Sequence, residues 1–136
     1  MLGTVNHLGL TVKDVQTSEP FYDAILTFMG YQQVEKTDNF RMWWSEKAGA
    51  IFISPTNPTS ANQTHDRYSP GLHHLAFNAE SRAQVDSLHQ ILQDMGATIL
   101  DPPAEYNQYA PGYYAVFFAD PDGIKLEFVH MPSIPD

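Results

Sequence analysis

Apolar and polar positions alternate near the start of the chain, between residues 5 and 12. A period of two is typical of a strand with one buried face. The apolar face would carry Leu8, Leu10 and Val12, and the other face His7, Gly9 and Thr11. Apolar residues then follow at helical spacing until Gly30 ends the stretch, in a stripe of Phe21, Tyr22, Ile25, Leu26 and Met29.

We expect Thr17 or Ser18 to cap this helix, with Pro20 in its first turn. Strands are predicted next over 31–36, 40–45 and 50–54. The order is therefore strand, helix and three strands. A segment rich in proline and small polar residues, 56–70, reads as a linker.

The same order restarts after the linker. We predict a strand over 72–79, a helix over 81–95 and a strand over 97–100, followed by a loop over 101–111. Two further strands, 113–119 and 124–130, are joined by an Asp-Pro-Asp-Gly turn. The inward positions of the helix would be Val85, Leu88, Leu92 and Met95.

A short motif marks the two copies. The segment His7-Leu-Gly-Leu-Thr recurs as His74-Leu-Ala-Phe-Asn, and a Met-Gly pair ends each predicted helix. An internal repeat indicates duplication of one supersecondary unit. We therefore predict an α+β fold of two tandem βαβββ modules, 1–55 and 71–136, which form a single domain over 1–136 with the linker 56–70.

Composition narrows the classes of partner. Seven Lys and Arg residues against sixteen Asp and Glu give a net charge of −9, which argues against nucleic acids and anionic membranes. No cysteine is present, so a metal site would use nitrogen and oxygen ligands. No signal peptide or long apolar run is apparent, and we expect a cytoplasmic protein.

Three residues are candidate metal ligands: His7, His74 and Glu127. Each is predicted on the strand face turned away from the helices, whereas His73 should point the opposite way. Two imidazoles and one carboxylate leave coordination positions open and suit Fe, Mn, Ni, Co or Zn. Each residue alone is also compatible with an ordinary strand position, so the prediction depends on the matched places of the two histidines.

The two βαβββ units, the His-Leu-x-Leu opening and the segment Gly112-Tyr-Tyr-Ala-Val-Phe-Phe-Ala-Asp-Pro-Asp-Gly-Ile-Lys-Leu-Glu-Phe-Val129 resemble the vicinal oxygen chelate superfamily. It includes glyoxalase I, extradiol dioxygenases, fosfomycin-resistance enzymes and bleomycin-binding proteins. The resemblance implies curved mixed sheets that form a cup, a divalent metal held by His7, His74 and Glu127, and a homodimer.

The fourth strand departs from the family pattern. Glyoxalase I-like and fosfomycin-resistance members usually take a further carboxylate from this strand, but the matching position lies near Phe52, and Ser54 is a poor ligand. The remaining two-histidine, one-glutamate set is similar to that of extradiol dioxygenases. Those enzymes are usually built from four such units, and this chain has two.

The sequence leaves two classes of function open. One is a metal-dependent enzyme, either a lyase or isomerase or a ring-cleaving oxygenase, that acts on a small substrate with vicinal oxygens. Glu127 would then be both a ligand and the catalytic base. The alternative is a non-catalytic, antibiotic-type binding protein, and a weaker possibility is an accessory protein that has lost its activity. Trp44, Tyr106 and Tyr114 are candidate substrate contacts.

Overall fold

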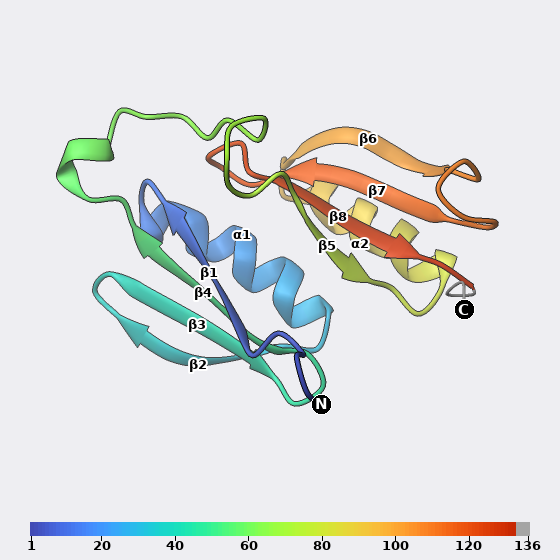
Figure 1. Ribbon diagram of the computed structural model, residues 1–136, viewed down its shortest axis with the longest axis horizontal. Coiled ribbons are helices and arrows are strands. Elements are labelled where there is room, and N and C mark those ends of the chain that lie inside the picture. The colour runs from blue at the N-terminus through green and yellow to red at the C-terminus, as the bar shows by residue number, and fades with distance from the viewer. Residues whose placement is uncertain (133–136) are drawn as a thin grey trace. The chain divides into compact units, whose positions relative to one another are not determined.

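The computed structural model describes residues 1–132, and the chain divides into two compact units with the boundary between Gln63 and Thr64. Each unit contains one four-stranded mixed sheet and one helix of at least three turns (Figure 1). The two predicted βαβββ modules and the α+β class are therefore confirmed. Among the residues described, no helix is long and apolar enough to cross a membrane.

The first unit contains a sheet with the strand order β1-β4-β3-β2. Strands β1 and β4 are parallel, and the other neighbours are antiparallel. The parallel pair requires a long connection, which contains the helix and the other two strands. The elements are β1 (His7–Val12), α1 (Val15–Phe28), β2 (Gln32–Thr37), β3 (Phe40–Ser45) and β4 (Gly49–Pro55).

The second unit repeats this topology with the strand order β5-β8-β7-β6, in which β5 and β8 are parallel. A short 3-10 helix, Pro58–Ser60, lies in the predicted linker before it. The elements are β5 (Leu75–Asn78), α2 (Arg82–Asp94), β6 (Thr98–Glu105), β7 (Tyr114–Ala119) and β8 (Lys125–His130).

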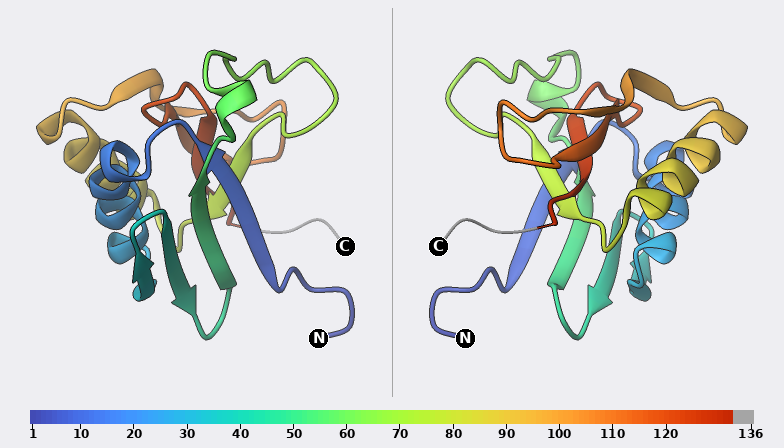
Figure 2. Two further views of the ribbon diagram at one scale, coloured as in Figure 1. Left: turned by 90° about the vertical axis from the view of Figure 1, so that its left-hand side faces the viewer. Right: turned by 90° about the vertical axis from the view of Figure 1, so that its right-hand side faces the viewer.

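Each helix covers one face of its own sheet (Figure 2). The predicted apolar stripes form these cores: Tyr22, Ile25, Leu26, Trp43 and Ile53 are fully buried in the first unit, and Val85, Leu88, Leu92, Phe118 and Leu126 in the second. Burial of large apolar side chains is the main stabilising contribution to such a layer. The opposite face of each sheet remains available for polar side chains.

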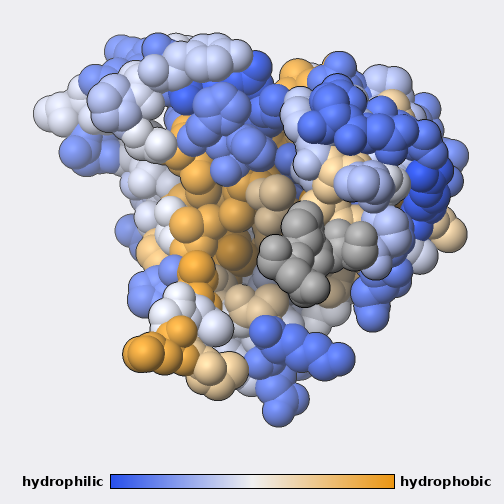
Figure 3. Space-filling view, turned by 45° about the vertical axis from the view of Figure 1, so that its right-hand side comes forward, coloured by the Kyte–Doolittle hydropathy of each residue, from blue (hydrophilic) through white to orange (hydrophobic). Residues whose placement is uncertain are grey.

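Apolar side chains also reach the surface, and Figure 3 shows hydrophobic surface among the hydrophilic regions of one face. The exposed large apolar residues are Met1, Leu2, Val5, Val34, Trp44, Tyr68, Met95, Leu100 and Tyr109. Of the adjacent tryptophans, Trp43 is core and donates a hydrogen bond to Asp23 over 2.9 Å. Met95 was predicted to face inward, but α2 ends at Asp94, and Met95 is its C-cap residue.

The start of α1 also differs from the prediction. Asp14 is the N-cap, and its carboxylate accepts hydrogen bonds from the Gln16 amide at 3.2 Å and the Thr17 hydroxyl at 2.5 Å. The helix therefore begins before Thr17 and Ser18, and Pro20 lies inside it. The predicted cap was wrong because Asp14 satisfies the first-turn donors one turn earlier, where Val15 is already buried.

Strand β6 is longer than the predicted 97–100 and includes Pro102 and Pro103, which were assigned to a loop. The pairing of β6 with β7 shifts register between Asp101 and Ala104, around the two prolines. A proline cannot donate to a strand ladder, but β6 is an edge strand, where a missing donor is tolerated.

Candidate functional site

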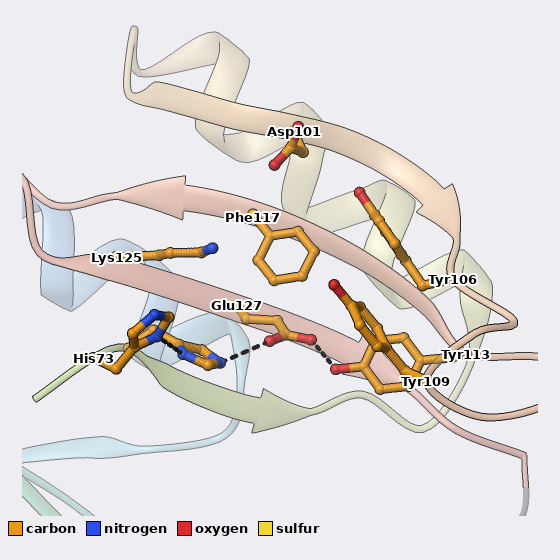
Figure 4. Close-up of a pocket in the computed structure, with 9 residues that line it drawn as sticks. His73, Asp101, Tyr106, Tyr109, Tyr113, Phe117, Lys125 and Glu127 are labelled. Carbon is orange, nitrogen blue, oxygen red and sulfur yellow. Dashed lines mark hydrogen bonds and ion pairs between the residues drawn. The ribbon is translucent and has the colours of Figure 1, made fainter. Parts of the chain in front are cut away.

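A cavity of about 360 Å³ lies on the face of the second sheet opposite α2 (Figure 4). Its walls combine aromatic rings with ionisable groups. The lining residues are His73, His74, Asp101, Tyr106, Tyr109, Tyr113, Phe117, Lys125 and Glu127. A cavity of this size with a few polar groups that point to one place is typical of a small-molecule site.

The structure brings two of the three predicted ligands together in this cavity. Glu127 lies in the middle of β8, and the parallel pairing places Ala76 of β5 beside it. His74 comes two residues before Ala76, just before the strand begins, and lines the same cavity as Glu127. Its Nε2 atom lies 3.2 Å from Oε1 of Glu127. The Glu127 side chain is 3% exposed and that of His74 is 34% exposed, so the acid is deep and the imidazole reaches the opening.

Tyr113 completes the surroundings of the buried carboxylate. Its hydroxyl donates a hydrogen bond to Oε2 of Glu127, as the dashed line in Figure 4 marks. Desolvation, together with this hydrogen bond and the nearby carboxylate charge, raises the pKa of Tyr113. The phenol therefore remains a proton donor at neutral pH. Each carboxylate oxygen of Glu127 thus has one partner from the chain.

His73 lines the same cavity, and the prediction that it points the opposite way was wrong. Its Nδ1 lies 2.7 Å from Nδ1 of His74. Strict alternation fails here because β5 begins only at Leu75, so both histidines precede the strand. Desolvation lowers the pKa of His73, and the positive charges of His74, Arg67 and Lys125 act in the same direction. A close contact between two ring nitrogens requires one to donate and the other to accept.

The third predicted ligand, His7, is the first residue of β1 and lies in the other unit. Its Nδ1 is 2.8 Å from Oδ1 of Asn6, which leaves Nε2 as the nitrogen available to a metal. Among residues 1–132, no three His, Asp or Glu side chains form a group that could hold a metal. That His7 joins His74 and Glu127 stays a prediction.

An aromatic ring occupies the place on β4 that the family resemblance would give to a fourth ligand. Phe52 pairs with Gly9 of β1, and the Phe52 ring lies 6.1 Å from the His7 ring, centre to centre. A Cβ atom at Gly9 would lie 2.2 Å from Phe52, so the ring rests on the glycine. The chain supplies no carboxylate at this position.

The three predicted substrate contacts lie in different places. Tyr106 lines the cavity, in T-shaped contact with Phe117 at 5.4 Å between ring centres. Tyr114 does not line this cavity, and its hydroxyl donates to Asp86 of α2 over 2.6 Å. Trp44 belongs to the first unit and is 48% exposed. Tyr113, and not Tyr114, contacts Glu127. Strand alternation could have identified it, because Tyr113 lies on the same strand face as Phe117.

The comparison with known proteins agrees with this architecture. The model of the Glyoxalase/Bleomycin resistance protein/Dioxygenase superfamily matches residues 4–128, and the chain belongs to this superfamily. The protein YqjT of Bacillus subtilis (strain 168) is 33% identical to this chain over 125 residues, which cover 92% of the chain and 97% of YqjT.

Two further relatives cover nearly the whole chain. The metallothiol transferase FosB of Staphylococcus saprophyticus is 26% identical over 136 residues, which cover 100% of this chain and 82% of FosB. A solved glyoxalase-type structure from Bacillus halodurans has a TM-score of 0.83 and 30% identity, and the match covers 96% of this chain and 97% of that one.

Proposed function

We propose that this protein is a metal-dependent enzyme that acts on a small substrate with vicinal oxygens. The observation that carries the proposal is the pairing of His74 Nε2 with a buried carboxylate oxygen of Glu127 at 3.2 Å. A nitrogen and an oxygen at this spacing, at the base of a cavity, are suited to share a divalent cation. His7 is the third ligand that we propose, supplied within one chain or across a homodimer.

The surroundings of the three residues fit a metal. In a metal site, the ring nitrogen or carboxylate oxygen that does not bind the metal usually forms a hydrogen bond with a neighbouring group. Glu127 has Tyr113 on its second oxygen, His74 has His73 on Nδ1, and His7 has Asn6 on Nδ1. Imidazole and carboxylate ligands suit Fe, Ni, Zn, Co or Mn. Such an ion would supply Lewis-acid stabilisation of negative charge on the substrate oxygens.

The side chains of the cavity define the remaining roles. Glu127 is the proposed base, which accepts a proton from the substrate, because its carboxylate faces the cavity next to His74. Tyr113 keeps its proton and positions that carboxylate. Tyr106 and Tyr109 stack at 5.6 Å between ring centres and form an aromatic wall of the cavity. The relative FosB is named a metallothiol transferase, which is consistent with a metal site.

The reaction is either a lyase or isomerase step or ring-cleaving oxygenation. These alternatives differ in substrate and in metal. Oxygen uptake with catechols by the iron-loaded protein would identify an oxygenase, whereas turnover of α-ketoaldehyde–thiol adducts by the nickel- or zinc-loaded protein would identify glyoxalase-type chemistry. Both assays start from one metal-free preparation, which is then loaded with the metal that each assay requires.

Metal titration tests the proposal. We expect the protein to bind one of Fe, Ni, Zn, Co or Mn at one ion per site, and His74→Ala or Glu127→Gln to abolish that binding. His65→Ala is the matched control, because His65 is exposed and lies outside the cavity. If none of the five ions binds at near-stoichiometric levels, the proposal is wrong.

The second candidate is a binding protein without catalysis, which the aromatic wall of the cavity favours. It would bind a small, partly apolar ligand through Tyr106, Tyr109 and Tyr113. Such a protein would bind its ligand equally well with and without a metal, and His74→Ala would leave ligand affinity unchanged.

A further inference from the structure

Lys125 is a half-buried cation in the wall of the cavity. Its ammonium lies 4.7 Å from the centre of the Phe117 ring, a contact between a cation and a π face. None of the ion pairs formed by the residues described involves Lys125. Withdrawing an ammonium from water is unfavourable unless another charge compensates it, so an unpaired lysine in a cavity wall is suited to an anion from outside the chain.

The backbone fixes the direction of Lys125. It is the first residue of β8, and Glu127 lies two positions further along, so both side chains leave the same face of the sheet. Its partner across the ladder is Ala119, whose side chain carries no charge that could pair with the lysine. The two charged groups therefore border one cavity from neighbouring positions of a single rigid strand.

The charges in the cavity are separated in space. Glu127 is engaged by His74 and Tyr113, and Asp101 lies on β6 beyond Phe117, on the side of Tyr106 (Figure 4). The negative charge of Asp101 contributes to the raised pKa of Tyr106, after desolvation as the larger cause. Lys125 lies on the side of the cavity away from the tyrosines, and its ammonium points towards the Phe117 ring. The cavity thus has a positive side at Lys125 and an aromatic side at the tyrosines.

We infer that Lys125 binds an anionic group of the substrate, and that the substrate is a small organic anion whose apolar part contacts Tyr106 and Tyr109. The inference rests on the proposed function, because it places the vicinal oxygens of that substrate at His74 and Glu127. An ammonium at a fixed distance from the metal ligands selects molecules that carry a carboxylate or similar group beyond the chelating oxygens. Lys125 is accordingly a specificity-determining residue.

A matched pair of ligands tests the inference. Catechol and 3,4-dihydroxybenzoate have the same vicinal oxygens and differ by one carboxylate, and calorimetry on the zinc-loaded protein measures both affinities. We expect the carboxylate-bearing ligand to bind about tenfold more tightly or better. Lys125→Gln should remove this preference and leave the affinity for catechol within about twofold, whereas Lys125→Arg should retain the preference.

Lys47→Gln is the control, because Lys47 is an exposed lysine in the first unit and should not affect either affinity. Equal affinity for the two ligands, a preference that persists in Lys125→Gln, or failure of the zinc-loaded protein to bind either ligand would overturn the inference. Binding of Fe, Ni, Zn, Co and Mn is measured first and separately, and an ion that binds replaces zinc in the calorimetry if zinc itself does not bind. Failure of the unaltered protein to bind any of the five ions would contradict the proposed function, whereas metal binding without a preference for charge contradicts only the role of Lys125.

Discussion

The hydroxyl of Tyr113 donates a hydrogen bond to Oε2 of Glu127, whose other oxygen faces His74. Tyr113 immediately precedes β7, and Glu127 lies in the middle of the adjacent strand β8. The two residues are far apart in sequence, but the antiparallel pairing of β7 and β8 brings them together. The contact orients the most deeply buried acid of the cavity.

Removal of this hydroxyl should weaken metal binding without changing the ligands themselves. We expect Tyr113→Phe to lower metal affinity about 10- to 100-fold, as loss of an outer-shell partner does, and to reduce the free energy of unfolding by about 1–3 kcal/mol. Metal titration and urea unfolding measure the two effects. Tyr109→Phe alters another tyrosine of the same wall, and we expect it to change metal affinity less than twofold. Equal effects of the two substitutions would show that the Tyr113 contact has no special role.

The adjacent histidines should differ in the size of their effects. His74→Ala removes a proposed ligand and should abolish metal binding, whereas His73→Ala removes the partner of His74 Nδ1 and should weaken binding about tenfold. Competition with a coloured chelator measures both affinities. Unchanged affinity in His73→Ala would mean that another group orients the His74 ring.

A methyl group at Gly9 should displace the Phe52 ring. The added Cβ would lie 2.2 Å from the ring, so the ring has to move off β1. We expect Gly9→Ala to reduce the free energy of unfolding by about 1–3 kcal/mol. The double variant with Phe52→Ala, compared with Phe52→Ala alone, should show a much smaller effect of the methyl group. Additive losses in this thermodynamic cycle would contradict the contact.

Acid should destabilise the first unit through Glu19. Burial raises the pKa of Glu19, but hydrogen bonds from Gln33 and Arg41 and the charges of Arg41 and Lys36 outweigh it, so the pKa lies below its ordinary value. A carboxyl with a lowered pKa in the folded state stabilises the protein above its unfolded-state pKa of about 4.5. This contribution is lost as the pH falls through the lower, folded-state value.

Glu19→Gln should therefore flatten the acid limb of the stability curve below about pH 4.5. At neutral pH it should cost about 1–3 kcal/mol, because Arg41, which is 4% exposed, loses its charged partner at 2.6 Å. Chemical unfolding across a pH series measures both effects. Glu46→Gln alters an exposed acid and is the control. An acid limb of unchanged steepness in Glu19→Gln would contradict the prediction.

The repeat and the hydrophobic periodicity were sufficient to predict the order of the elements in both units. Strand alternation also identified Glu127 as facing away from α2, because β8 is regular from Lys125 to His130. Predictions failed where regular structure begins or bends. His73 lies before β5, so the alternation of strand side chains does not determine where it points. The two prolines of β6 were assigned to a loop because the local sequence does not show that this strand lies at the edge of its sheet.

The hydrogen-bonded surroundings of the site were not predictable from local patterns. Strand alternation from Phe117 identifies Tyr113 instead of Tyr114, but its contact with Glu127 requires the register of β7 against β8, which long-range pairing determines. The same holds for the contact of Lys125 with the Phe117 ring, which depends on the pairing of β8 with β7. The sequence shows which aromatic and charged residues lie near the end of the chain. Which of them contact one another depends on how the strands of the second sheet pair.

The two prolines of β6 have a consequence for association between molecules. An exposed sheet edge offers amide donors to which a foreign strand can attach, and this is a common route to aggregation. Pro102 and Pro103 lack those donors, and they stand where β6 departs from its regular register with β7. A ladder of hydrogen bonds to a foreign strand would therefore be interrupted at this point of β6. We expect the two prolines to disfavour fibrillar assembly through this edge.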